Sequence, residues 1–313
     1  MKTGRHYADR LTEALRARGT PAIVGIDPLL DRLPPELKPP DKRLSSAVAA
    51  IETFSRAVVD AVLDCVAAVK INAAFFEAFY AEGLAAYYRL VSYAHRRGLM
   101  VIGDVKRGDI GSTAALYARG HLATPSLEDV DADCIPDAVT LSGYLGEGAV
   151  KPFIEQARAE GRGVYILVRP SDPGADEVHE FGSGARFYEH MARLVGRWGA
   201  APELIGDAGL SCVGAVVAPK DRVGTAALRT MLPHTPFLVP GYGTQGATAE
   251  DCRPCLRPDG TGAVINASRS VIYAYLRPEY QRQYGADWRA CVRGACRALA
   301  ADLARLTAGG KCV

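Results

Sequence analysis

The feature that most constrains the fold is a series of eight short apolar or β-branched runs, with longer stretches between them. Strands that are apolar along their whole length are typical of a parallel sheet covered on both faces. Eight repeats of strand and connection favour a closed α/β architecture, the (β/α)8 or TIM barrel, over an open sheet. The expected strands are residues 22–27, 67–72, 99–106, 138–142, 164–169, 212–218, 236–241 and 262–268.

The connections between these strands have the spacing of amphipathic helices. We expect helices within residues 44–64, 73–97, 148–160, 183–198, 220–231 and 288–307, preceded by an N-terminal helix in the first 19 residues. Residues 28–43 are too rich in proline for a regular helix, and we interpret them as a long first βα loop. Residues 170–184 form a second irregular stretch and are a candidate mobile lid. No domain boundary is visible, so we expect residues 1–313 to form one barrel domain.

Composition excludes several classes of partner. The formal net charge is +2 and no basic tract stands out, which argues against nucleic-acid binding. No stretch approaches the roughly 20 apolar residues of a membrane span, and the N-terminus lacks the apolar region of a secretory signal. The eight cysteines are then expected to be free thiols in a reducing cytoplasm. Cys252 and Cys255 have CxxC spacing, but no second pair or nearby His completes a metal site, so we interpret them as structural.

Charged residues stand at the ends of the second and third expected strands. The chemistry of such barrels lies at the C-terminal ends of the strands. Asp104 and Lys106 are two residues apart, which places both side chains on one face of a strand. Inward-facing charges are costly unless they pair, and Lys70 on the preceding strand can supply a partner. With Asp109 three residues after Lys106, the sequence predicts an alternating Lys–Asp–Lys–Asp array, which we interpret as catalytic rather than as a purely structural ion-pair network.

A phosphate site is predicted after the last two strands. The segment PGYGTQG contains three glycines, Gly241, Gly243 and Gly246, which allow backbone N–H groups to turn toward an anion. The segment NASRS adds Arg269, whose guanidinium can bind phosphate in a two-pronged geometry. Loops after strands seven and eight are where barrels commonly bind phosphate. Together the two segments indicate a phosphorylated ligand.

These segments carry a resemblance to a known family. DVKRGDI resembles the DxKxxDI signature of the orotidine 5′-phosphate decarboxylases. KINAAFFEAFYAEG, PGYGTQG and INASRS are similar to the longer bacterial branch of that family, and the resemblance extends from about residue 20 to residue 275. It implies an enzyme, a carboxy-lyase that converts orotidine monophosphate to UMP in pyrimidine biosynthesis without a metal or another cofactor.

The resemblance also implies roles for individual residues. Lys70, Asp104, Lys106 and Asp109 match the catalytic tetrad, with Asp109 completing the site of the partner subunit in a homodimer. The residues implied or expected to bind substrate are Asp27 for the ribose hydroxyls, Gln245 and Arg269 for the 5′-phosphate, Ser142 for the pyrimidine, and Asn72, which faces the same way as Lys70. Ser142 could equally be a loop hydroxyl that bonds its own backbone. The part played by Arg169, at the end of the fifth expected strand, is left open.

The chemistry explains why a cationic side chain is needed. Loss of CO2 from carbon 6 leaves an electron pair in an sp2 orbital that the ring cannot delocalise, so charge must be stabilised electrostatically. We expect Lys106 to do this as an ammonium and to donate its proton to carbon 6. Asp104 would repel the substrate carboxylate, and Lys70 and Asp109 would hold the other two residues in position.

Two other functions compete with this interpretation. A sugar-phosphate decarboxylase or aldolase of the same superfamily would use Mg²⁺, for which Glu77 and Asp104 are conceivable ligands. A non-catalytic barrel that only binds a phosphorylated ligand is the other. The nucleotide-type segments argue against the first, and the complete charged array argues against the second.

Overall fold

Eight parallel strands close into a barrel in the order in which they occur in the chain. The computed structural model describes residues 5–243 and 246–307. Each strand pairs with the next and β8 pairs with β1, which confirms the expected (β/α)8 barrel. The strands are β1 (Ala22–Ile26), β2 (Ala68–Asn72), β3 (Met100–Arg107), β4 (Ala138–Leu141), β5 (Gly163–Arg169), β6 (Val213–Val217), β7 (Phe237–Val239) and β8 (Ala263–Ala267).

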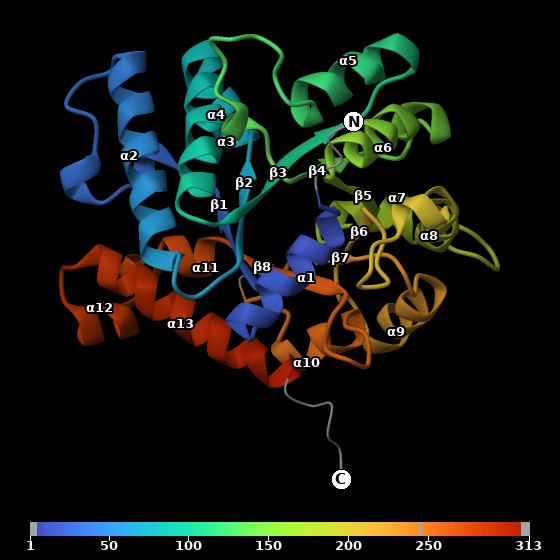
Figure 1. The fold of residues 1–313 in the computed structure, drawn as a ribbon. Coiled ribbons are helices and arrows are strands. Elements are labelled where there is room, and N and C mark those ends of the chain that lie inside the picture. The colour runs from blue at the N-terminus through green and yellow to red at the C-terminus, as the bar shows by residue number, and fades with distance from the viewer. Residues whose placement is uncertain (1–4, 244–245, 308–313) are drawn as a thin grey trace.

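Helices surround the strands (Figure 1). The helices in the described part of the chain are α1 (Tyr7–Arg18), α2 (Leu44–Val62), α3 (Ala74–Glu77), α4 (Tyr80–Arg96), α5 (Gly111–Leu122), α6 (Glu147–Glu160), α7 (Asp176–His179), α8 (Phe187–Trp198), α9 (Arg222–Met231), α10 (Ala249–Cys252), α11 (Arg269–Ile272), α12 (Pro278–Tyr284) and α13 (Trp288–Thr307). Within this described part, none of the helices combines the length and apolarity needed to cross a membrane.

The helix predictions need two main corrections, and the short helices α7, α10, α11 and α12 were also not predicted. Residues 73–97 form α3 and α4 rather than one helix, because Tyr80 adopts a positive φ of 56° at the junction. Helix α5 was not predicted at all. Only four of its residues are buried, Ala114, Ala118, His121 and Leu122, and Leu116 on the same helix is exposed, so no continuous apolar stripe marks it in the sequence.

The proline-rich loop after β1 contains no α-helix, as expected, but two short 3₁₀ turns, Leu30–Arg32 and Pro35–Leu37. Tyr273 ties this loop to the barrel. Its hydroxyl donates to the carbonyl oxygen of Asp27 at 2.9 Å and accepts from the N–H of Leu29 at 2.6 Å. The loop is therefore held beside the C-terminal end of β1 without needing regular structure.

Helix α1 covers the N-terminal end of the barrel and lies across the strands in the view of Figure 1. Its Tyr7 is fully buried, and the Tyr7 hydroxyl donates to the hydroxyl of Tyr165 at 3.0 Å. Helix α1 thus closes the N-terminal end of the barrel, so a ligand would enter at the C-terminal ends of the strands.

Candidate active site

A cavity of about 320 Å³ lies at the C-terminal ends of the strands. All eight strands contribute to its lining, directly or through the residues that follow them, and β6 does so through an apolar side chain, Val216. The lining residues are Asp27, Lys70, Asn72, Asp104, Lys106, Thr140, Leu167, Pro170, Ser171, Asp172, Val216, Leu238, Pro240, Gly241, Tyr242, Asn266, Ser268 and Arg269.

Three of the predicted charged residues meet in this cavity. The ammonium of Lys70 donates to Oδ2 of Asp104 at 2.6 Å, and the ammonium of Lys106 donates to Oδ1 at 2.6 Å. Asp104 and Lys70 are buried, whereas the side chain of Lys106 is 50% exposed and reaches into the open part of the site. One carboxylate is thus held between two cations, with one cation facing the space where a ligand would lie.

Electrostatics keeps this cluster ionised. Burial by itself would raise the pKa of Asp104, but the charges of Lys70 and Lys106 outweigh it and hold the pKa well below its usual range. Burial would likewise lower the pKa of Lys70, yet the carboxylates of Asp104 and Asp27 raise it. Asp104 is therefore a carboxylate and Lys70 an ammonium at neutral pH.

Asp109 does not join this cluster within one chain. It lies in the loop after β3, is absent from the cavity lining, and its Oδ1 accepts from the N–H of Ile110 at 2.7 Å. The neighbouring Ile110 is 63% exposed. The expected four-membered array is thus a cluster of three in the single chain, and a role for Asp109 stays a prediction that requires a second chain.

Two polar side chains from β1 and β8 have buried oxygens without a partner. Asp27 lines the cavity, and its Oδ1 has no hydrogen bond within the described part of the chain. Asn266, which the sequence analysis did not single out individually, likewise presents an unpaired Oδ1, while its amide donates to Ser268 at 3.1 Å. Unpaired buried acceptors are uncommon, and here they provide positions for ligand hydroxyl or N–H groups.

The other expected substrate residues divide between the lining and the surroundings. Asn72, the last residue of β2, lines the cavity, and its Oδ1 accepts from the N–H of Ala74, the first residue of α3, at 3.2 Å. Ser142 does not line the cavity, and its N–H donates to the carbonyl of Arg107 at 2.8 Å. Thr140, two residues earlier on the same face of the chain, takes that place. A pyrimidine contact from Ser142 therefore stays a prediction.

The predicted phosphate segments border one side of the same cavity. Gly241 and Arg269 both line it, and Gly241, Gly243 and Gly246 all have positive φ values, 94°, 74° and 91°. These are backbone conformations that favour glycine. The N–H of Gly243 donates to the carbonyl of Ala247 at 3.0 Å and that of Gly246 to the carbonyl of Gly243 at 2.9 Å, so these two groups hold the turn together. Arg269 begins α11 and is exposed, and it forms no ion pair with a carboxylate among the described residues. Gln245 lies outside the described residues.

The comparison with protein families gives one match. A model described as the Orotidine 5'-phosphate decarboxylase / HUMPS family matches residues 46–283, about three quarters of the chain. The chain belongs to this family. The resemblance inferred from the sequence motifs is thereby confirmed.

Individual relatives within this family cover nearly the whole chain. A protein of Rhodopirellula baltica named orotidine 5'-phosphate decarboxylase is 36% identical over 92% of this chain and 96% of its own length. One of Clostridium perfringens with the same name is 33% identical over 88% of this chain and 92% of its own. The solved structure of Leishmania donovani OMP decarboxylase is 28% identical, with a TM-score of 0.66 over 95% of this chain and 98% of that one. The carboxy-lyase class expected from the sequence is the class that these names denote.

The family match begins at residue 46 and so includes Lys70, Asp104, Lys106 and Arg269 but not Asp27.

A magnesium-dependent relative would need carboxylates free to bind a metal. Glu77, the conceivable second ligand, instead pairs with Arg107 and is absent from the cavity lining. Both oxygens of Asp104 are already bound to ammonium groups. The geometry therefore offers Mg²⁺ no pair of free carboxylates at these two positions.

Arg169 has a structural position in this decarboxylase-family barrel. It is buried at the end of β5, where it donates to Glu180 at 2.7 Å and to Asp221 at 2.8 Å, and it lies over the ring of Tyr188. It thus fastens the loop 170–184 to the start of α9. The same loop contributes Ser171 to the cavity wall, so the fastening shapes the site without placing Arg169 in it.

The cysteine pair has the properties of core residues. Cys252 and Cys255 are fully buried, and burial raises the pKa of the Cys252 thiol to about 12 and raises that of Cys255 further. Thiols held in the protonated form are poor nucleophiles and poor metal ligands. This agrees with the structural interpretation of the CxxC spacing.

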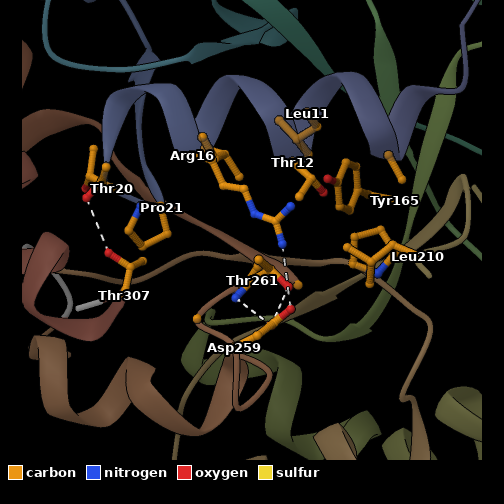
Figure 2. Close-up of a pocket in the computed structure, with 17 residues that line it drawn as sticks. Leu11, Thr12, Arg16, Thr20, Pro21, Tyr165, Leu210, Asp259, Thr261 and Thr307 are labelled. Atoms are coloured by element: carbon orange, nitrogen blue, oxygen red, sulfur yellow. Dashed lines mark hydrogen bonds and ion pairs between the residues drawn. The ribbon is translucent and has the colours of Figure 1, made fainter. Parts of the chain in front are cut away.

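A second cavity, of about 180 Å³, lies at the opposite end of the barrel beneath α1 (Figure 2). Apolar side chains such as Leu11 and Leu210 line most of it. The charged pair at its edge, Arg16 and Asp259, is 3.9 Å apart and largely exposed. Because catalytic groups of such barrels lie at the other face, we assign the active site to the cavity around Asp104.

Proposed function

We propose that this chain decarboxylates orotidine 5′-phosphate to UMP without a metal or organic cofactor, with Lys106 delivering the proton to carbon 6. The observation that carries the proposal is the Asp104 carboxylate clamped between Lys70 and Lys106 on the floor of the cavity. A protein that only binds an anionic ligand gains nothing from a buried carboxylate beside that ligand. The family membership supports the same reaction.

The proposed step needs no other reactant. The bond between carbon 6 and the carboxylate breaks, CO2 leaves, and the electron pair that remains takes a proton from the Lys106 ammonium. Lys106 then recovers a proton from solvent, to which its half-exposed side chain has access. Asp104 lies where the substrate carboxylate would approach, and repulsion between the two negative charges disappears as CO2 departs.

The remaining substrate groups have matching partners. The 5′-phosphate would contact Arg269 and the glycine-rich segment 241–246, including Gln245. The unpaired Oδ1 of Asp27 would accept from a ribose hydroxyl. Ser142 remains the proposed contact for the base. Asn72 remains the proposed contact for the part of the substrate that lies near Lys70. These assignments give each end of the nucleotide a partner of complementary chemistry.

We further propose that the enzyme is a homodimer in which Asp109 completes the site of the partner. Exposed apolar side chains gather on the loops and the helix that follow β3 and β4: Ile110, Leu116, Tyr117, Tyr144 and Leu145. Clusters of this kind mark protein–protein interfaces. We also propose a cytoplasmic location, because the cysteines in the described residues are free thiols, as in a reducing compartment.

The first test is the fall in ultraviolet absorbance when purified protein converts orotidine 5′-phosphate in the presence of EDTA. Wild type should convert it, while Lys106→Ala should lose turnover by at least about 1,000-fold yet still bind UMP, because electrostatic stabilisation and protonation are both removed. Lys151→Ala, on the exposed face of α6, serves as the control and should behave as wild type. Turnover that requires added Mg²⁺, or substantial activity of Lys106→Ala, would contradict the proposal.

A further inference from the structure

Lys106 has an unusual backbone conformation. Its φ is 44°, and among the described residues only Tyr80 shares a positive φ without being glycine. The same stretch interrupts the regular pairing of β3 with β4, whose register shifts between Gly103 and Arg107. Conformations of this kind persist only where surrounding contacts enforce them. Something must therefore hold Lys106 in place.

The side chain of Thr140, on β4, provides that contact. Its Oγ1 accepts from the N–H of Lys106 at 3.0 Å and donates to Oδ1 of Asp104 at 2.9 Å. Thr140 is 1% exposed and lines the cavity. The direction of both bonds is fixed, because an amide N–H can only donate and an ionised carboxylate can only accept. One hydroxyl thus links the backbone of the proposed proton donor to the carboxylate beside it.

We propose that Thr140 is a positioning residue of the reaction, which sets the ammonium of Lys106 and the carboxylate of Asp104 in the geometry that the transition state requires. This inference rests on the proposed function. Oδ1 of Asp104 receives both Lys106 Nζ and Thr140 Oγ1, so the hydroxyl fixes the rotation of the carboxylate about its Cβ–Cγ bond. The hydrogen bond to the Lys106 N–H fixes the position of the Lys106 backbone, from which the Lys106 side chain extends into the cavity. Without the hydroxyl, the Lys106 N–H loses its partner and the local backbone is free to relax from its strained form.

The decisive comparison is Thr140→Val, which keeps the shape and removes the hydroxyl, against Thr140→Ser, which keeps the hydroxyl. We expect Val to lower kcat on the order of 100-fold through misplacement of the reacting groups, while KM and UMP binding change by less than about threefold. Ser should restore kcat to within about fivefold of wild type. Thr20→Val is the matched control. Thr20 is also buried, its hydroxyl accepts the N–H of Ala22 at 3.3 Å, and it lies at the opposite end of the barrel (Figure 2).

A second measurement does not depend on turnover. Hydrogen exchange of the peptide containing residues 105–108 should speed up in Thr140→Val but not in Thr140→Ser or Thr20→Val. If wild type does not convert orotidine 5′-phosphate while this exchange pattern holds, the proposed function fails and the structural hold of Thr140 on Lys106 stands. If wild type is active and Val keeps both its kcat and its exchange protection, or if Ser is as impaired as Val, the positioning role is wrong.

Discussion

Asp104 illustrates how much a single residue depends on its neighbours. Its spacing from Lys106 placed both side chains on one face of a strand, and the cost of burying a lone charge required a partner from the next strand. Lys70 is that partner, at 2.6 Å. Since the pKa of Asp104 is lowered, the stabilisation from its ionised form is present above the usual carboxylate range and is lost only as pH falls through the lowered value.

Arg269 carries a prediction about the phosphate. Arg269→Ala should weaken binding of UMP by about 100-fold, because a charge-assisted, two-pronged contact is lost, and should change binding of uridine by less than about threefold. Calorimetric titration of both ligands into both proteins measures this difference. The exposed Arg282 on α12, replaced by Ala, is a suitable control. Equal losses for the two ligands would remove Arg269 from the phosphate site.

Residues also show where sequence reasoning stopped. Thr140 stood inside a segment that was assigned to a strand, and nothing in its local spacing distinguishes it from a core threonine. Asn266 stood inside the INASRS segment and was not singled out individually. The contact of Thr140 with Asp104 joins two strands, so it becomes visible only when the register of β3 and β4 is known.

At the scale of elements, a polar network joins α1, α4 and the start of β4 at the N-terminal end of the barrel. Buried Asp137 accepts from Arg10 at 2.6 Å and from the N–H of Val101 at 2.8 Å, and His95 lies 2.9 Å from it. The other ring nitrogen of His95 faces the carbonyl of Asp133 at 2.7 Å. Both neighbours of the ring are acceptors, so the geometry suits a doubly protonated imidazolium.

This network predicts a pH-dependent stability. Burial would lower the pKa of His95, but the hydrogen bond and charge of Asp137 outweigh it and raise the pKa above its usual value. The stabilisation is then fully present below the usual pKa of about 6.5 and is lost as pH rises through the raised value. His95→Gln should cost about 2 kcal/mol at pH 6 and clearly less at pH 9, as measured by denaturant unfolding. Exposed His190→Gln is the control, and a loss that does not vary with pH would refute the charged form of His95.

Elements were predicted unevenly for a physical reason. Strands and the helices that pack on them with an apolar stripe, such as α13, were found almost to the residue. Helix α5 was missed because it exposes Leu116 and buries only four residues, two of which are alanines. If the proposed dimer interface covers the face of α5 that carries Leu116, the apolar residues of α5 are buried on two sides, one within the chain and one against the partner.

At the scale of the whole molecule, the closed barrel brings strand ends distant in sequence around one cavity, but it leaves Asp109 outside. The shared-site dimer predicts that two inactive variants complement each other. Lys106→Ala and Asp109→Ala should each be inactive, and an equal mixture that exchanges subunits should regain about a quarter of wild-type activity. Half of its dimers are hybrids, and one of the two sites in each hybrid is intact.

The complementation is measured by absorbance after the two variants are unfolded and refolded together, with each variant refolded alone as the control. Sedimentation at several protein concentrations establishes the oligomeric state. A protein that sediments as a monomer while fully active would refute the shared site. A dimer whose mixture stays inactive would show that Asp109 acts within its own chain or not at all.

The sequence by itself determined the barrel, the site at the strand ends, and the pairing of Lys70, Asp104 and Lys106. These follow from periods of two or of about 3.6 residues and from the cost of burying charge, which are local properties of the chain. Only the tertiary structure decided that Thr140 rather than Ser142 faces the cavity, that Arg169 fastens a loop, and that Asp109 lies outside. These depend on the register between β3 and β4 and on contacts between distant loops, which arise from closure of the barrel and leave no trace in local spacing.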